Sequence, residues 1–217
     1  MKKARVIPHT SWAAKSLWSV EGKTMLMLLF ALAILGIGDG LIVLANLGSS
    51  PWTVLSQGVA LQADVSIGWA SFWISCLVML AWIPLKLRFG LGTILNIIVI
   101  AFFLGLTVKI VPEPTALLSR ILFGGIGLLL YGLGTALYLT CHQGAGPRDG
   151  LMVGFCQRLH LKVGIVRTSL EVSVCVLGYL LGGTVGIGTA AIGGIVQLCL
   201  NSIARLPHLP YEGNNLN

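Results

Sequence analysis

Apolar residues along the chain fall into six long runs, separated by shorter stretches that contain glycine, proline or charged residues. A helix needs about 20 mostly apolar residues to cross the hydrocarbon core of a bilayer, within a range of roughly 17–25. Each run is of this order of length and predicts a transmembrane helix. The predicted spans are 25–47, 69–85, 92–111, 118–141, 167–183 and 188–204. The pattern therefore predicts an all-α polytopic membrane protein with about six transmembrane helices.

Two further apolar pieces, 52–64 and 148–160, are too short to cross a bilayer. Each follows a Gly-x-x-Pro sequence, GSSP from Gly48 and GAGP from Gly144. Proline suits the first turn of a helix, where its missing N–H leaves no bond unmade. Both pieces are therefore predicted to be short helices. Two interpretations remain open: re-entrant helices that dip into the protein, or amphipathic helices that lie in the headgroup layer.

The pattern recurs when the chain is shifted by 96 residues. In that register, without a gap, seven pairs of glycines coincide, and Pro51 coincides with Pro147. A glycine-rich chain gives two or three such coincidences by chance, so seven indicate an internal duplication. The glycine pairs are Gly36 with Gly132, Gly38 with Gly134, Gly48 with Gly144, Gly58 with Gly154, Gly68 with Gly164, Gly90 with Gly186 and Gly92 with Gly188.

Each copy holds three predicted spans, and an odd number makes the second copy enter the membrane from the opposite side. The sequence therefore predicts two inverted 3+3 repeats, 24–112 and 118–206, each with one short Gly-Pro-started helix. Secondary transporters are often built in this way, with sites near the middle of the membrane where the repeats meet. Channels share the architecture, and a duplicated scaffold without transport is the structural alternative.

Composition and charge agree with the membrane class. Of the 217 residues 56% are hydrophobic and 10% are charged, whereas soluble domains carry about 25% charged residues. Twelve of the 14 Lys and Arg fall in segments that share one side of the predicted membrane, and two fall on the other side. The positive-inside rule then places the basic segment 1–23 and the polar tail 207–217 in the cytoplasm. The net charge of +7 thus reflects topology, and no nucleic-acid partner is expected.

No residue pattern indicates metal or redox chemistry. The five cysteines have no Cys-x-x-Cys or Cys/His metal spacing, so we expect neither a metal site nor a disulfide. No nucleotide-binding loop, catalytic Ser/His/Asp order or acidic pair at membrane depth is present. We therefore expect no cofactor and no enzyme activity.

The stretch GAGPRDGL, 144–151, places a Gly-Pro turn, an arginine and an aspartate between apolar runs. A helix start presents free N–H groups and a partial positive charge, which suit an anion or a carboxylate. We therefore predict a substrate site at the two helix starts, with Arg148 on the anionic group and Asp149 holding Arg148 or capping the helix. The alternative is an ordinary loop arginine beside a capping aspartate. The candidate binding residues are Arg148, Asp149, Gly146, Pro147, Gly48, Pro51, Trp52 and His142.

Three other ionisable residues, within predicted spans or at their ends, are candidates for a functional or structural role. Asp39, in GIGDG, is a carboxylate where lipid makes charge expensive, so it is a candidate proton- or ion-coupling group, with interhelical hydrogen bonding as the alternative. Arg167 and Glu171 have helical i,i+4 spacing, which favours a structural ion pair over a site.

Several motifs are similar to those of one family. They are LGSSPWTVLSQG at 47–58, RFGLGT at 88–93, GAGPRDGLMVG at 144–154, Arg167-Thr168 with Glu171, and GGTVGIGT at 182–189. From about Gly36 to Leu206 the chain resembles the YczE-like bacterial integral membrane proteins and, more loosely, the YitT/YyaS group. The resemblance implies a multi-pass protein of the bacterial inner membrane and brings no agreed activity.

The predicted function is transport or facilitated passage of a small anionic or zwitterionic solute. The competing class is a non-transporting membrane scaffold or regulatory protein. The expected partners are the lipid bilayer and a small-molecule solute. A homodimer is permitted by the small-xxx-small face of Gly178 and Gly182, although this face serves internal packing equally well.

Overall fold

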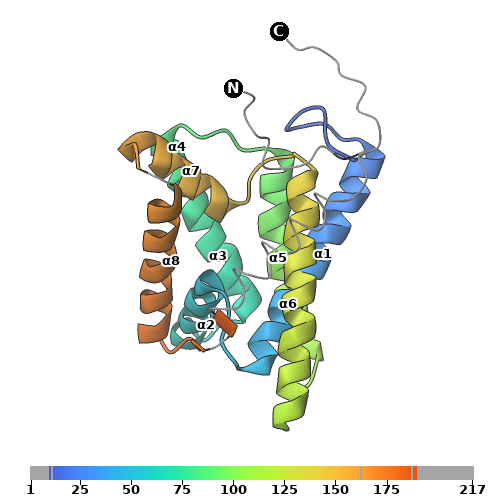
Figure 1. Cartoon of the computed structure of the whole chain (residues 1–217), viewed down its shortest axis with the longest axis vertical. Coiled ribbons are helices and arrows are strands. Elements are labelled where there is room, and N and C mark those ends of the chain that lie inside the picture. The colour runs from blue at the N-terminus through green and yellow to red at the C-terminus, as the bar shows by residue number, and fades with distance from the viewer. Residues whose placement is uncertain (1–9, 11, 162, 187, 190–217) are drawn as a thin grey trace.

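Every regular element of the structure is an α-helix (Figure 1). It is a computed structural model that describes residues 10, 12–161, 163–186 and 188–189. The all-α class predicted from the sequence is therefore confirmed for the described residues. The helices are α1 Gly22–Ala45, α2 Pro51–Ala63, α3 Ile67–Leu80, α4 Trp82–Leu85, α5 Leu91–Ile110, α6 Leu117–Thr140, α7 Pro147–Leu159 and α8 Val163–Leu180.

Four stretches of helix in the described part are long and apolar enough to cross a membrane: α1, α3 continued by α4, α5 and α6. They coincide with the first four predicted spans, so the membrane class holds. Helix α8 coincides with the fifth span and begins four residues before it. The sixth span, 188–204, lies outside the described residues except for 188–189, as does the tail 207–217. The count of six spans stays a prediction.

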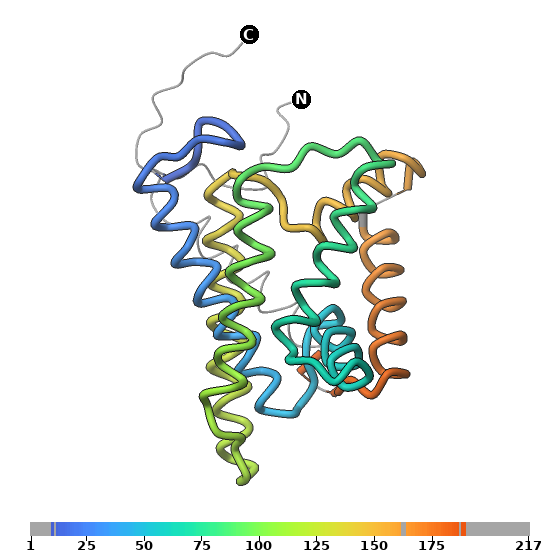
Figure 2. The backbone as a smooth tube through the Cα atoms, turned by 180° about the vertical axis from the view of Figure 1, so that it is seen from behind, coloured from blue at the N-terminus to red at the C-terminus, as the bar shows by residue number. Residues whose placement is uncertain are grey.

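The helices form two groups that meet at α3 and α5 (Figures 1 and 2). Helices α1, α5 and α6 form one group, in which α1 packs on both others. In the other group, the short helices α2 and α7 each pack against α3 and α8. They lie at opposite ends of the molecule, with α7 at the upper end of Figure 1 and α2 at the lower end.

Two glycines allow α1 and α6 to approach closely. A Cβ on Gly38 of α1 would lie 2.6 Å from the backbone nitrogen of Tyr131, and a Cβ on Gly134 of α6 would lie 2.7 Å from the carbonyl oxygen of Ala31. These contacts exclude any larger residue, as in other small-residue helix interfaces in membranes. Gly38 and Gly134 are one of the glycine pairs that coincide in the 96-residue register.

The turns of the backbone also recur in that register. Eight described residues have a positive φ between 52° and 118°, and they form four pairs that are each 96 residues apart. Residues other than glycine rarely adopt this left-handed backbone conformation. Because every such residue has a counterpart 96 positions away, the backbone turns support the repeat that the glycines indicate. The pairs are Asn46 with His142, Gly48 with Gly144, Asp64 with His160, and Lys86 with Gly182.

The bounds of the short helices follow the same register. Both α2 and α7 have 13 residues, begin with a proline, and end before a residue with left-handed backbone, Asp64 and His160. Their buried residues are concentrated in the first eight positions, through Gly58 and Gly154. Both helices therefore insert their proline-started ends into the protein.

The small-residue face of Gly178, in α8, and Gly182, just after it, packs against α2 of the same chain. A Cβ on Gly178 would collide with the backbone of Leu55, so α2 packs directly on this part of α8.

The described part of the N-terminal segment packs against the end of α6 and the residues that follow it. Trp12 Nε1 donates to Thr140 Oγ1 at 3.0 Å, and Gln143 Nε2 donates to the Ser19 carbonyl at 2.6 Å.

Candidate functional site

A cavity of about 270 Å³ lies where the starts of α2 and α7 come together. Seven helices, all except α4, contribute side chains to its wall. Most of the residues that the sequence singled out as candidates line it, although they come from elements far apart in the chain. These are Asp39, Pro51, Trp52, the stretch Gly146 to Asp149, Arg167 and Glu171.

Two predicted binding residues, Gly48 and His142, do not line the cavity. Gly48 has a φ of 104° and packs against Gly186, where an added Cβ would collide with the backbone, so it serves a close contact between chain segments. His142 has a φ of 53° just after the end of α6. Gly48 lies in the turn before α2 and His142 in the turn before α7, so both shape the backbone that leads into the short helices.

The carboxylate of Asp39 is held at the start of α2. Asp39 is only 1% exposed, and the hydroxyl of Thr53 lies 3.0 Å from its Oδ1 and 2.9 Å from its Oδ2. Ser50 Oγ lies 2.7 Å from Thr53 Oγ1 and accepts from the Thr53 backbone N–H at 3.3 Å. Because Thr53 donates to the carboxylate, the Ser50 hydroxyl is left to donate to Thr53. The cap of α2 and the buried acid thus form one hydrogen-bonded chain.

Arg148 and Asp149 do not act on each other as the sequence reasoning expected. The Arg148 guanidinium lies 5.5 Å from the centre of the Trp52 ring, a cation–π contact. In the described part of the chain no carboxylate oxygen lies within 4.0 Å of it. Asp149 Oδ2 instead accepts a hydrogen bond from the Tyr138 hydroxyl at 2.6 Å, and the cap residue of α7 is Gly146, without a side-chain bond.

The expectation that Asp149 orients Arg148 or caps α7 is therefore wrong. The reason lies in the tertiary structure, because α6 places Tyr138 next to the start of α7, where its hydroxyl binds Asp149. The entry to α7 is also fixed from outside the helix, by Trp82 Nε1 donating to the Pro147 carbonyl at 3.0 Å and Thr93 Oγ1 donating to the Ala145 carbonyl at 2.9 Å.

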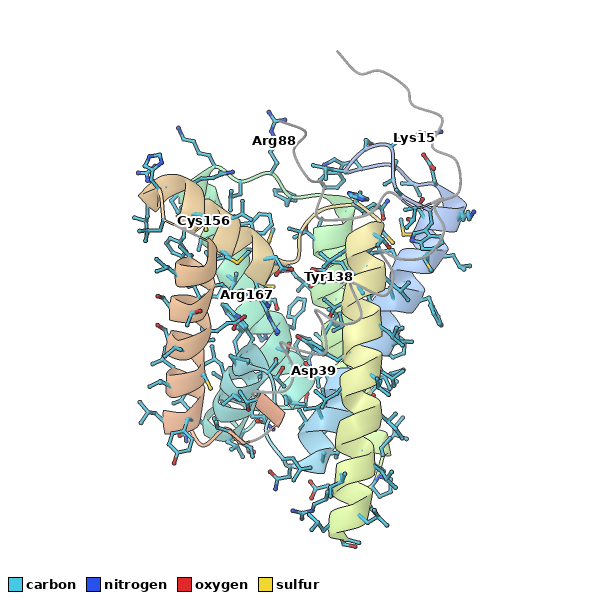
Figure 3. The ribbon with its side chains drawn as sticks, viewed as in Figure 1. Lys15, Asp39, Arg88, Tyr138, Cys156 and Arg167 are labelled. Carbon is cyan, nitrogen blue, oxygen red and sulfur yellow. The ribbon has the colours of Figure 1, made fainter. Side chains whose placement is uncertain are left out.

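Arg167 and Glu171 form an ion pair at 2.9 Å along one face of α8. Both also line the cavity, so the pair that the sequence assigned to structure belongs to the wall of the candidate site. Figure 3 shows Asp39, Tyr138 and Arg167 near the middle of the molecule, between the group of α1, α5 and α6 and the group that contains α8.

The residues that line the cavity are related by the 96-residue register. Each residue of the first copy named below faces the same space as its equivalent in the second copy. Equivalent positions of the 96-residue register therefore share one cavity. The pairs are Leu35 with Tyr131, Asp39 with Thr135, Pro51 with Pro147, Trp52 with Arg148, Ser71 with Arg167, and Ser75 with Glu171.

Sequence reasoning missed several of these wall residues, above all Ser71, Ser75, Tyr131 and Tyr138. Hydroxyl groups are common in membrane helices and carry no signal alone. Ser71 and Ser75 could have been predicted from the 96-residue register, because they are the equivalents of Arg167 and Glu171. For metal binding, the described residues hold no group of three or more His, Cys, Asp or Glu side chains.

Comparison with known proteins gives the relationships of the chain. The family described as "Family of unknown function (DUF6198)" matches residues 22–203. The chain belongs to this family. An uncharacterized protein of Haemophilus influenzae (strain ATCC 51907 / DSM 11121 / KW20 / Rd) is 70% identical over 215 residues, which cover 97% of this chain and 99% of that protein.

Two more distant relatives come from Bacillus subtilis (strain 168). The membrane protein YczE is 29% identical over 156 residues, covering 71% of this chain and 72% of YczE. The protein YyaS is 29% identical over 186 residues, covering 82% of this chain and 88% of YyaS. The predicted resemblance to YczE-like proteins and to YyaS is thus confirmed. No solved structure matches the chain.

Proposed function

We propose that this DUF6198 protein carries a small anionic or zwitterionic solute across the bacterial inner membrane. The observation that carries this proposal is the meeting of two proline-started helices, one from each copy, at one cavity lined by ionisable side chains. Discontinuous or re-entrant helices whose ends face a central cavity are the means by which many secondary transporters bind substrates and ions.

The proposal includes the inverted 3+3 repeat. Its supports are the paired positive-φ residues, the paired wall residues and the opposite placement of α2 and α7 (Figure 1). In this arrangement the two short helices are re-entrant, and their buried first turns favour this reading over helices that lie in the headgroup layer. Alternating access then corresponds to rocking of one copy against the other around the cavity.

The wall residues have distinct roles in this proposal. Arg148 and the start of α7 bind the anionic group of the solute, and Trp52 holds the guanidinium in place. Asp39, buried and facing the same space, is the group that couples transport to a proton or cation. Basic segments lie at the cytoplasmic face, with both ends of the chain in the cytoplasm.

Uptake into proteoliposomes tests the proposal. The purified protein is reconstituted, and the entry of radiolabelled lactate, phosphate, glutamate, glycine and the other common amino acids is measured against protein-free liposomes. We expect at least one solute to enter faster with the wild type, and Arg148→Gln to slow its entry about tenfold or more, because a charged hydrogen-bond donor is lost from the site.

Arg158→Gln is the matched control, because Arg158 lies in the exposed last turn of the same helix. It should transport as the wild type does. Equal entry with and without protein for every solute contradicts the transporter. Capture of a specific membrane protein, with normal folding of Arg148→Gln, then favours a scaffold or regulatory role.

A further inference from the structure

The two copies contribute unlike side chains to the cavity. At three paired positions the second copy supplies Arg148, Arg167 and Glu171, where the first copy supplies an indole or hydroxyl group. Asp39 reverses the pattern, since its equivalent in the second copy is Thr135. Among the described lining residues, Asp39 is therefore the one ionisable group that the first copy presents.

The formal charge of the wall disfavours a simple anion. The described lining residues include two guanidinium groups against three carboxylates, which leaves a formal charge of −1. Arg167 and Glu171 neutralise each other at 2.9 Å, so Arg148 is left to balance both Asp39 and Asp149. An added anion brings a second unbalanced negative charge to this wall, and like charges repel.

One part of the wall nevertheless offers donors to an anionic group. Arg148 stacks on Trp52 and, among the described residues, has no carboxylate oxygen within 4.0 Å. The backbone N–H groups of Arg148 and Asp149 are in the first turn of α7 and have no acceptor in the described part of the chain. The guanidinium and the helix start therefore present several donors to one side of the cavity.

Another part of the wall offers an acceptor to a cationic group. Both oxygens of Asp39 accept only from the Thr53 hydroxyl among the described residues, although a carboxylate has about four acceptor positions. Asp39 and Arg148 line the same cavity but form no ion pair within 4.0 Å. Thr135 also lines the cavity, and its Oγ1 is buried without a hydrogen-bond partner in the described part, which leaves one more polar atom for a bound solute.

The geometry points to a small zwitterion, of α-amino-acid size, as the solute of this cavity. Its carboxylate binds Arg148 and the start of α7, and its ammonium binds Asp39. The inference rests on the proposed transport function and names the substrate class of the same site. A neutral zwitterion adds no net charge and satisfies donor and acceptor parts together, whereas a simple cation leaves Arg148 and the α7 start unpaired. The 270 Å³ of the cavity is below the roughly 300–1,000 Å³ of pockets for drug-sized ligands.

Ligand binding to the purified wild-type protein tests this inference separately from transport. The twenty common amino acids and glycine betaine are screened by thermal shift, and dissociation constants are measured by equilibrium dialysis. Each amino acid that binds is compared with its 2-hydroxy acid, which lacks the ammonium, and with its carboxamide, which lacks the carboxylate. We expect the amino acid to bind about tenfold or more tightly than either analogue, because each analogue leaves one buried charge unpaired.

Two variants assign the two ends of the solute. Asp39→Asn should reduce the preference for the amino acid over its hydroxy acid to less than about threefold, and Arg148→Gln should do the same for the preference over the carboxamide. Asp64→Asn and Arg158→Gln are the controls, since both side chains are exposed at the far ends of α2 and α7. Both controls should keep the wild-type preferences.

Three results overturn the inference. They are equal or tighter binding of the hydroxy acid to the wild type, no binding of any zwitterion, and an unchanged preference in a folded Asp39→Asn protein. The comparison of analogues on the wild type decides the matter even where a variant does not fold. Uptake of a simple anion together with the first or second result rejects the zwitterion and leaves the transport proposal standing.

Discussion

The hydroxyl of Thr53 is the side chain on which the placement of Asp39 depends. Thr53 is 0% exposed, donates to the carboxylate of α1, and lies in the first turn of α2. A carboxylate buried without a partner is costly, and the start of a helix is a favourable place for its negative charge. One threonine thus joins a membrane-spanning helix to a short helix and stabilises an acid inside the protein.

Thr53→Val should lower stability, and Thr53→Ser should largely restore it. Valine has nearly the shape of threonine but removes the donor, which leaves a buried acceptor unsatisfied at about 1–3 kcal/mol. Serine retains the hydroxyl. The measurement is the midpoint of thermal unfolding in detergent, followed by intrinsic fluorescence. Equal midpoints for Thr53→Val and the wild type would show that the hydrogen bond to Asp39 contributes nothing to folding.

Between elements, the closest approach of α1 to α6 depends on glycine, and this contact supports one side of the cavity. Gly38 and Gly134 each face backbone of the other helix, where an added Cβ would be within 2.7 Å. In a membrane the hydrophobic effect does not drive helices together, so such close packing is a main source of their association. The same two helices carry Asp39, Tyr131 and Tyr138 into the wall.

Gly134→Leu should separate α1 from α6, whereas Gly125→Leu on the same helix should be tolerated. A leucine at Gly134 has no space beside Ala31 and Leu35, while nothing lies within 4 Å of a Cβ at Gly125. Overpacking a buried contact costs about 1–3 kcal/mol or more. The fraction of monodisperse protein after size-exclusion chromatography in detergent measures the effect. A similar loss in both variants would mean that adding a leucine to α6 lowers the yield of monodisperse protein in general, and that the contact with α1 is not the cause.

For the whole molecule, the described loops fall at two ends with unlike charge. Arg88 and Lys15 are at the upper end in Figure 3, where α7 also ends in Figure 1, and α2 ends at the lower end. Helices α4 and α7 also lie at the upper end in Figure 1, and each ends with a basic residue, Lys86 after α4 and Arg158 in the last turn of α7. The positive-inside rule then predicts that the upper end faces the cytoplasm.

Cysteine labelling in intact cells tests this orientation. In a variant without the native cysteines, Asp64→Cys should react with a membrane-impermeant maleimide in cells with a permeabilised outer membrane. Arg88→Cys and His160→Cys should react only in inside-out vesicles. Labelling of all three after detergent treatment is the control for reactivity. Reaction of Asp64→Cys from the same side as His160→Cys would exclude opposite placement of the two short helices.

The sequence alone determined the membrane class, the bounds of most helices and much of the candidate site. These properties are local or periodic. The length of an apolar run predicts a span, proline and glycine mark the starts of α2 and α7, and a shift of 96 residues brings seven glycine pairs into coincidence. Arg148, Asp39 and Glu171 were recognisable because a charge inside a membrane helix or beside it is expensive and therefore conspicuous in the pattern.

Only the tertiary structure decided which of these groups meet and what each one contacts. Asp39 is separated from Arg148 by more than a hundred positions in the chain, yet both line one cavity. Asp149 bonds to Tyr138 rather than to Arg148, and Arg148 lies over Trp52, its equivalent in the other copy. Hydrogen bonds and ion pairs depend on distances of a few ångströms between side chains, and those distances are set by how the helices pack.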